Sequence, residues 1–250
     1  MLCELVSKTR LSDTVYDFVI ECPEMARQTK AGQFLHILCG GTSYLRRPIS
    51  VCDVIGGRRI RFVFEVRGSG TQELARRRIG DHLDILGPLG NGFSLDKAGD
   101  QAVLLVGGGI GVFPLLKLAK DLSGRATALL GFRSREAIVL ADAFTDACKN
   151  VFLATDDGSC GHHGFVTDIM ENIVRTNPVS MIYICGPKPM MARAAGIAKQ
   201  QGIPAEASME ERMGCGVGAC VTCTCTVGGV RKRVCKDGPV FDAAEVEFDG

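Results

Sequence analysis

The sequence predicts a multidomain protein with an N-terminal antiparallel β-barrel, a doubly wound α/β domain with a parallel sheet, and a small cysteine-rich C-terminal lobe. Three observations predict this architecture: alternating strands come first, strand–turn–helix order follows, and five of the twelve cysteines lie within residues 215–235. We place the three parts at 1–97, 98–208 and 209–250. With 250 residues, 46% of them hydrophobic, the chain can fill two proper cores.

The first part alternates as β-strands do. Tyr16, Phe18 and Ile20 fall on one face of a strand, and the residues between them fall on the other. Similar runs at 33–38, 59–66 and 81–86 repeat the pattern at the spacing of a small barrel or sandwich. We therefore predict an all-β first domain.

The middle part begins with an apolar strand at 102–106, a glycine-rich turn at 107–111 and an apolar helix at 112–122. This order is typical of a parallel sheet with crossover helices. Further strands are expected at 126–130, 151–154 and 181–185, and further helices near 165–174 and 189–199. The last part, with few apolar runs and an acidic, polar tail, is too small for a core of its own and would need a prosthetic group as a staple.

Charge and hydropathy exclude several classes of function. Lys plus Arg number 29 against 28 for Asp plus Glu, so no net field recruits nucleic acid or anionic lipid. The longest apolar stretch, 102–116, contains four glycines and a proline and is shorter than the roughly 20 residues of a membrane span. Residues 1–10 show no apolar signal segment. We expect a cytoplasmic protein in a reducing compartment, with no nucleic-acid or membrane partner.

The clustered cysteines predict a metal site. Cys215, Cys220, Cys223 and Cys235 begin with the C-x4-C-x2-C spacing of plant-type [2Fe-2S] sites, and glycines within the first loop let backbone N–H groups turn toward sulfur. The alternatives are zinc and inert thiols, although zinc ribbons usually show two C-x2-C pairs and this segment has one. Cys225 is a fifth cysteine, either an alternative ligand or a packing thiol.

Two segments of the barrel are candidates for binding a phosphate group. Residues 45–50 place an Arg, a Pro and a Ser at the end of an apolar run, where an Arg can bind a pyrophosphate bidentately; a surface Arg-Pro turn is the alternative. Residues 68–71 form a glycine-rich turn before a short helix, which can cradle an anion.

The turn at 107–111 follows a strand and opens a helix, the context that a dinucleotide-binding turn requires. Val112 stands where a third glycine would fall, and the second strand ends in 131–134 (GFRS) without the acidic residue that binds a ribose. A standard Rossmann dehydrogenase is therefore a poor fit.

These motifs in this order resemble the ferredoxin reductase superfamily and, more closely, its family of electron-transfer subunits of class 1B dihydroorotate dehydrogenases. The resemblance spans essentially the whole chain, and the cysteine spacing is its most specific part. It implies FAD on the barrel, NAD(H) on the α/β domain, and a [2Fe-2S] cluster facing an FMN-containing catalytic subunit in a two-plus-two heterotetramer. It rests on RPIS (47–50), GSGT (68–71), GPLGNGF (87–93), GGGIGVFP (107–114), GFRS, CGP (185–187) and the four-cysteine lobe.

The resemblance also implies the site residues. Arg47 would bind the FAD pyrophosphate and Ser50 would lie near the reactive ring nitrogen, whereas Glu65 stands where the family often has Arg and cannot replace that cation. Cys215, Cys220, Cys223 and Cys235 would hold the cluster. The remaining flavin residues implied are Pro48, Ile49, Phe64, Glu65, Val66, Gly70 and Thr71. The nicotinamide cofactor would contact Gly108, Gly109, Ile110, Gly111, Val112, Cys185, Gly186 and Pro187.

The expected function is electron transfer in pyrimidine biosynthesis, where dihydroorotate is oxidised to orotate. NADH gives two electrons as hydride and a [2Fe-2S] cluster takes one at a time, so a flavin between them resolves the mismatch. No catalytic side chain is required. The alternatives are the electron-transfer subunit of a paralogous NAD(P)H:ferredoxin oxidoreductase, sulfide dehydrogenase or hydrogenase and, in another class, a zinc-stapled binding module. Arg133 and Arg135 leave the choice between NADH and NADPH open.

Overall fold

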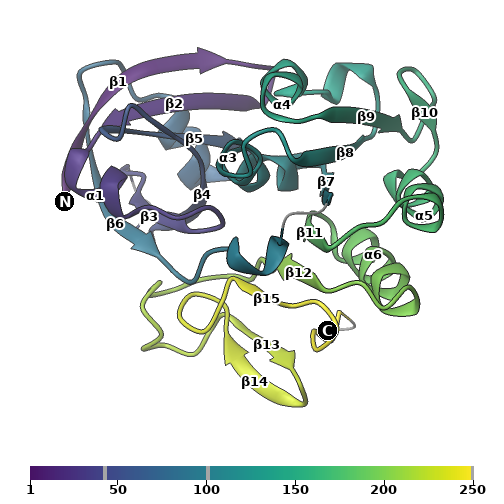
Figure 1. Ribbon diagram of the computed structural model, residues 1–250. Coiled ribbons are helices and arrows are strands. Elements are labelled where there is room, and N and C mark those ends of the chain that lie inside the picture. The colour runs from purple at the N-terminus through teal and green to yellow at the C-terminus, as the bar shows by residue number, and fades with distance from the viewer. Residues whose placement is uncertain (42–43, 100–101, 249–250) are drawn as a thin grey trace.

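The computed structural model describes residues 1–41, 44–99 and 102–248 and has the predicted multidomain architecture (Figure 1). A barrel, a seven-stranded sheet with helices on both faces, and a lobe with a two-stranded hairpin follow one another along the chain. Among the described residues, no helix is both long and apolar enough to cross a membrane.

The barrel closes in the order β1-β2-β5-β4-β3-β6 with antiparallel neighbours. Phe18 and Ile20 point into its core, as their alternation predicts, and so do Leu5, Ile37 and Phe62. The barrel elements are β1 (Leu2–Arg10), β2 (Val15–Glu21), α1 (Pro23–Gln28), β3 (Phe34–Leu38), β4 (Arg47–Ile55), β5 (Arg59–Glu65), α2 (Ser69–Ala75) and β6 (His82–Leu89).

The second sheet has the order β10-β9-β8-β7-β11-β12-β15, and all pairs except β12 with β15 are parallel. Its central strand is buried on both faces, with Leu104 and Val106 in one core and Val103 and Leu105 in the other. The strands are β7 (Val103–Gly108), β8 (Ala126–Phe132), β9 (Asn150–Thr155), β10 (His162–His163), β11 (Met181–Cys185), β12 (Ala205–Ser208) and β15 (Val240–Asp242).

Helices cover both faces of this sheet, as the doubly wound fold requires. α3 packs with α4 in one core, and α5 packs with α6 in the other (Figure 1). The helices are α3 (Phe113–Asp121), α4 (Ala141–Ala147), α5 (Val166–Thr176) and α6 (Lys188–Gln200), and the 3-10 turns are η1 (Asp96–Ala98), η2 (Gly109–Val112) and η3 (Arg135–Ala137).

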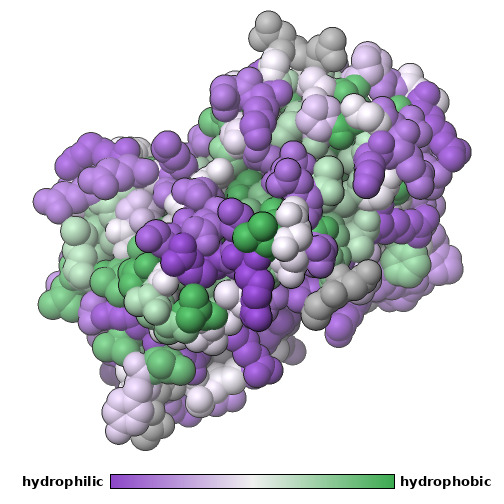
Figure 2. Space-filling model, turned by 90° about the horizontal axis from the view of Figure 1, so that it is seen from below, coloured by the Kyte–Doolittle hydropathy of each residue, from purple (hydrophilic) through white to green (hydrophobic). Residues whose placement is uncertain are grey.

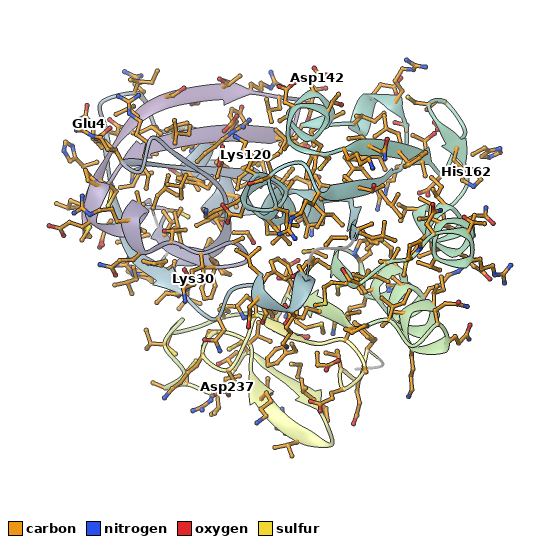
Figure 3. All side chains as sticks on the ribbon, in the orientation of Figure 1. Glu4, Lys30, Lys120, Asp142, His162 and Asp237 are labelled. Carbon is orange, nitrogen blue, oxygen red and sulfur yellow. The ribbon has the colours of Figure 1, made fainter. Side chains whose placement is uncertain are left out.

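Helix α3 also fixes the barrel against the sheet. Lys120 forms an ion pair with Asp53 of β4, whose side chain is 6% exposed, and lies centrally between the two parts in Figure 3. Glu206 of β12, also 6% exposed, accepts from Lys97 at 3.0 Å and from the Ser94 backbone N–H at 2.9 Å. Since a buried carboxylate that loses its partner is costly, these pairs favour one relative orientation.

The C-terminal lobe differs from its expected form in one respect. Its hairpin, β13 (Thr224–Val227) and β14 (Val230–Arg233), is small, but the tail expected to be polar adds β15 to the edge of the sheet. Val227, Val234 and Phe241 join the same core as α5 and α6. Packing on the α/β sheet therefore holds the lobe in addition to any prosthetic group.

The lobe also contacts the barrel. Asn91, in the tight loop after β6, donates from its backbone to the Gly238 carbonyl at 2.6 Å and from its side chain to the Asp237 carbonyl at 3.0 Å. A second contact joins Gly216 of the cysteine loop to His36 of β3. The lobe thus touches both larger parts.

Candidate functional site

The predicted arginine and the predicted glycine-rich turn of the barrel lie against each other. A Cβ on Gly70 would fall 2.7 Å from Nε of Arg47, so the guanidinium rests on the bare backbone of α2. Its Nη1 donates to the carbonyls of Leu45 at 2.6 Å and Arg46 at 3.3 Å. Within the described part of the chain, Nε and Nη2 make no hydrogen bond, which leaves donors for an anion.

Thr71 closes the turn that supports Arg47. Its hydroxyl accepts from the backbone N–H groups of Arg67 at 2.9 Å and Gly68 at 3.2 Å and donates to the Gly68 carbonyl at 3.1 Å. Pro48, Ile49 and Ser50 continue β4 as half-buried residues. The predicted flavin residues of β4 and α2 therefore form one continuous surface.

The predicted flavin residues of segment 64–66 do not all face the same surface. Phe64 is buried in the barrel core, stacked on Tyr16 at 5.9 Å and edge-on to Phe18 at 5.1 Å, so its ring faces away from the barrel surface. Glu65 accepts from Nε of Arg67 at 2.5 Å. That arginine, which sequence reasoning missed, supplies a cation beside the unexpected carboxylate; the E-x-R spacing on a strand end was the available signal.

The two predicted nicotinamide segments meet at the carboxyl ends of adjacent strands. A Cβ on Gly111 would fall 2.4 Å from the Cys185 carbonyl oxygen and 2.5 Å from Cα of Gly186, and one on Gly108 would fall 2.9 Å from Pro187. The turn between 108 and 112 therefore packs backbone to backbone against 185–187.

This junction is a topological switch point of the sheet. From β7 the chain adds β8 and β9 on one side and then β11 and β12 on the other, and Gly107 is the register partner of Cys185. Open α/β sheets bind ligands in the crevice at such a point. Gly109 and Ile110 are half-buried there. Met190 of α6 also contacts Gly108.

The four predicted cluster ligands associate in two pairs. The backbone N–H of Cys220 donates to Sγ of Cys215 at 3.4 Å, and the backbone N–H of Cys235 donates to Sγ of Cys223 at 3.4 Å. The first pair is at or near the surface and the second is buried. Among the described residues, no group of three or more His, Cys, Asp or Glu side chains is arranged to hold a metal ion. Two pairs fit a binuclear cluster, in which each iron takes two terminal sulfurs, better than one tetrahedral zinc.

The loop turns its backbone toward sulfur, as predicted. Sγ of Cys215 accepts from the N–H groups of Val217 at 3.4 Å, Ala219 at 3.2 Å and Cys220 at 3.4 Å. Gly216 and Gly218 adopt φ of +73° and +84°, a region that favours glycine. This nest of donors suits a negatively charged sulfur.

Nearby hydrogen-bond donors lower the pKa of the two outer thiols, Cys215 and Cys220. For Cys215 the main cause is the backbone N–H of Cys220. For Cys220 the Thr222 hydroxyl is the main cause, and the pKa falls to about 6. Burial, followed by the neighbouring Cys223 thiol, raises the pKa of Cys235 to about 12. The surroundings of the outer pair therefore lower the pKa of both thiols, and the inner pair is shielded from water.

Several neighbours complete the site. Cys225 is half-buried against the sheet core, as a packing thiol would be. Arg233 pairs with Asp237 at 3.0 Å and donates to the Gly218 carbonyl at 3.3 Å. His36 was missed, because a lone histidine in an alternating strand gives no signal; burial is the main cause that lowers its pKa.

The chain matches known proteins along its whole length. Residues 210–247 match the iron-sulfur cluster binding domain of dihydroorotate dehydrogenase B, and residues 105–196 match the oxidoreductase NAD-binding domain. The protein named dihydroorotate dehydrogenase B (NAD(+)), electron transfer subunit, from Geobacillus kaustophilus (strain HTA426) is 40% identical, over 97% of this chain and 96% of that protein. Its counterpart from Geobacillus thermodenitrificans (strain NG80-2) is 42% identical, with the same coverage.

Solved structures agree with this picture. A chain from the structure of an NADH-dependent reduced ferredoxin-NADP oxidoreductase, studied for flavin-based electron bifurcation, is 33% identical with a TM-score of 0.90. The match covers 100% of this chain and 91% of that one. The ferredoxin reductase of carbazole 1,9a-dioxygenase, at 20% identity and a TM-score of 0.68 over 82% of this chain and 66% of that one, shares the fold.

Proposed function

The chain belongs to the family of electron transfer subunits of dihydroorotate dehydrogenase B (NAD(+)), and from this premise we propose how its residues pass electrons between NAD(H) and a partner's FMN. The observation that carries the proposal is spatial. The Cys215 loop packs on β3, whose neighbour β4 begins with the RPIS motif. The proposed cluster and flavin sites are thus adjacent, while the switch point for NAD(H) lies on the α/β sheet.

When bound, FAD and the [2Fe-2S] cluster together let a two-electron hydride donor feed a one-electron path. The residues of the chain would bind these cofactors and orient them. Arg47, seated on Gly70, would bind the flavin pyrophosphate bidentately, and Ser50 on the same strand would approach the ring. The half-buried backbone of β4 would keep water from that edge.

For the other two cofactors, backbone matters more than side chains. The close contact of Gly111 with 185–187 would shape a flat crevice for the nicotinamide, with Gly109 and Ile110 at its rim. The N–H groups directed at Cys215, with Cys220, Cys223 and Cys235, would hold the cluster. Arg135 donates to the Ser159 carbonyl at 2.9 Å, which supports NADH over a 2′-phosphorylated cofactor.

The partner would dock on the lobe. Beside the cysteine loop is a hollow of about 520 Å³, and exposed valines lie within the loop and at the tip of the β13–β14 hairpin. Figure 2, which views the molecule from below, shows apolar side chains set among hydrophilic ones. Such a mixed surface suits an FMN-containing catalytic subunit in a two-plus-two heterotetramer. The exposed valines are Val217, Val221 and Val230, and the hollow is lined by Val221, Thr224, Arg231, Lys232, Arg233 and Asp237.

We also propose that the chain works in the cytoplasm, and that its parts divide at 1–97, 98–208 and 209–250. All twelve cysteines are free thiols, including the buried Cys3 and Cys22, whose sulfurs lie 3.1 Å apart and would form a disulfide in an oxidising compartment. The division is supported by the barrel strands ending at Leu89 and by the start of the lobe after β12.

The test is anaerobic purification of the chain with and without a dihydroorotate dehydrogenase catalytic subunit, followed by visible spectra. We expect flavin and cluster bands that bleach with NADH alone, and with dihydroorotate only when the partner is present. A colourless protein would refute the cofactor proposal. Bands that do not bleach with dihydroorotate in the presence of the catalytic subunit would refute the proposal that this subunit is the partner.

A second function is favoured by one observation, the full-length match to a chain of an NADH-dependent reduced ferredoxin-NADP oxidoreductase. In this alternative the same cofactors serve another partner. Bleaching by NADPH or by reduced ferredoxin in the partner complex, with no response to dihydroorotate, would select it.

A further inference from the structure

His36 is buried between the barrel and the cysteine loop with its ring unpaired. The residue is 1% exposed, and neither ring nitrogen makes a hydrogen bond to the described part of the chain. Leaving a buried polar group unpaired destabilises the folded protein. A leucine would fill the same strand position without this penalty. The imidazole at this position therefore indicates a role other than packing.

The contacts of the ring indicate what this role is. A Cβ on Gly216 would fall 2.5 Å from Nδ1 of His36, so the loop backbone lies directly on the ring. The backbone carbonyls of Arg46 and Cys215 are also close enough to the ring to raise its pKa, against the lowering caused by burial. On the barrel side, His36 is the register partner of Pro48 in the RPIS motif. The imidazole therefore separates the proposed flavin strand from the first cluster ligand.

We propose that His36 is a positioning residue for the iron–sulfur cluster, setting the Cys215 loop against the flavin strand and donating its ring N–H to the Cys215 side of the cluster. This inference rests on the proposed function. Hydrogen bonds to the sulfurs of such clusters set their reduction potential, and a donor stabilises the reduced, more negative state. The orphan nitrogen of the structure gains its acceptor when the cluster is assembled.

The experiment compares three variants in the purified, cofactor-loaded complex by EPR-monitored redox titration. His36→Leu removes both nitrogens, His36→Gln keeps an amide N–H, and Thr167→Val removes another buried polar group without a described partner, far along the chain on α5. We expect His36→Leu to lower the equilibrium constant for cluster reduction about tenfold, which is about 59 mV for one electron, and to shift the EPR signal. His36→Gln should recover part of the shift, and Thr167→Val should match wild type.

A wild-type potential and EPR signal in His36→Leu would overturn the proposal, whatever that variant does to stability. If His36→Leu does not load a cluster, His36→Met replaces it, because Met adapts to irregular gaps. Loss of the cluster in His36→Leu and His36→Met, with a cluster retained in His36→Gln, supports the proposal. Loss of the cluster in all three His36 variants overturns it. Wild-type protein that lacks flavin or cluster would refute the proposed function instead, so the two failures are distinguishable.

Discussion

Two glycine-rich loops of this molecule use glycine for different physical reasons. In the cysteine loop, Gly216 and Gly218 have positive φ, and the turn directs three N–H groups at Cys215. In the nicotinamide turn, Gly108 and Gly111 have ordinary φ, and what matters is the missing Cβ beside 185–187. Gly216 and Gly218 therefore need backbone freedom, as Gly109 does at φ +53°, whereas Gly108 and Gly111 need only the space of the missing Cβ.

The largest effect is expected from removing one of the predicted cluster ligands. Cys223→Ser should abolish cluster absorption and reduce iron from about two per chain to near zero, because a neutral hydroxyl is a poor replacement for thiolate. Iron analysis and visible spectra measure this. Cys225→Ser, two residues away and half-buried, is the matched control and should keep the cluster. Equal iron loss in both variants would make Cys225 a ligand.

The proposed flavin site differs from both loops, because its expected anion contact is a side chain, Arg47, rather than backbone. Arg47→Gln should weaken FAD binding roughly 30-fold, since a hydrogen bond to a charged group contributes about 2 kcal/mol. Titration of the flavin-free protein with FAD gives the affinity. Arg58→Gln removes an exposed guanidinium on the turn between β4 and β5 and should bind as wild type does. Unchanged affinity in Arg47→Gln would remove Arg47 from the site.

The two reasons for glycine predict opposite orders of substitution. At Gly218 we expect Asn to be better tolerated than Ala, by up to about 1 kcal/mol, because Asn adopts positive φ more readily. At Gly111 we expect Ala to cost about 1–3 kcal/mol and the larger Asn to cost more. Denaturant unfolding of the four variants measures both orders. The same order at the two positions would contradict the distinction.

The smallest effect is expected at Gly196, which serves neither purpose. It lies in the middle of α6, and a methyl group on its Cα would have no described neighbour within 4 Å outside its own helix. Gly196→Ala should therefore stabilise the protein by about 0.5–1 kcal/mol with unchanged NADH oxidation. Thermal unfolding measures the gain, and destabilisation would reveal a contact that the structure lacks.

Much of the fold followed from local pattern. Alternation at 16–20 predicted a barrel strand, and the order of strand, glycine turn and helix after residue 102 predicted the doubly wound sheet. Both patterns are local because side-chain period depends only on backbone conformation. The third strand pattern, in the tail at 240–242, was missed because three residues are too few for a period and the partner strand β12 is distant in sequence.

The sequence by itself predicted the cluster ligands, since four spaced cysteines and their glycines lie within a short segment. It also indicated the arginine and the glycine turns of the other sites. Only the tertiary structure brought Arg47 onto Gly70, the turn at 108–112 onto 185–187, and His36 beneath Gly216. Those contacts join residues tens to hundreds of positions apart, and their energy comes from packing, which no local pattern of residues encodes.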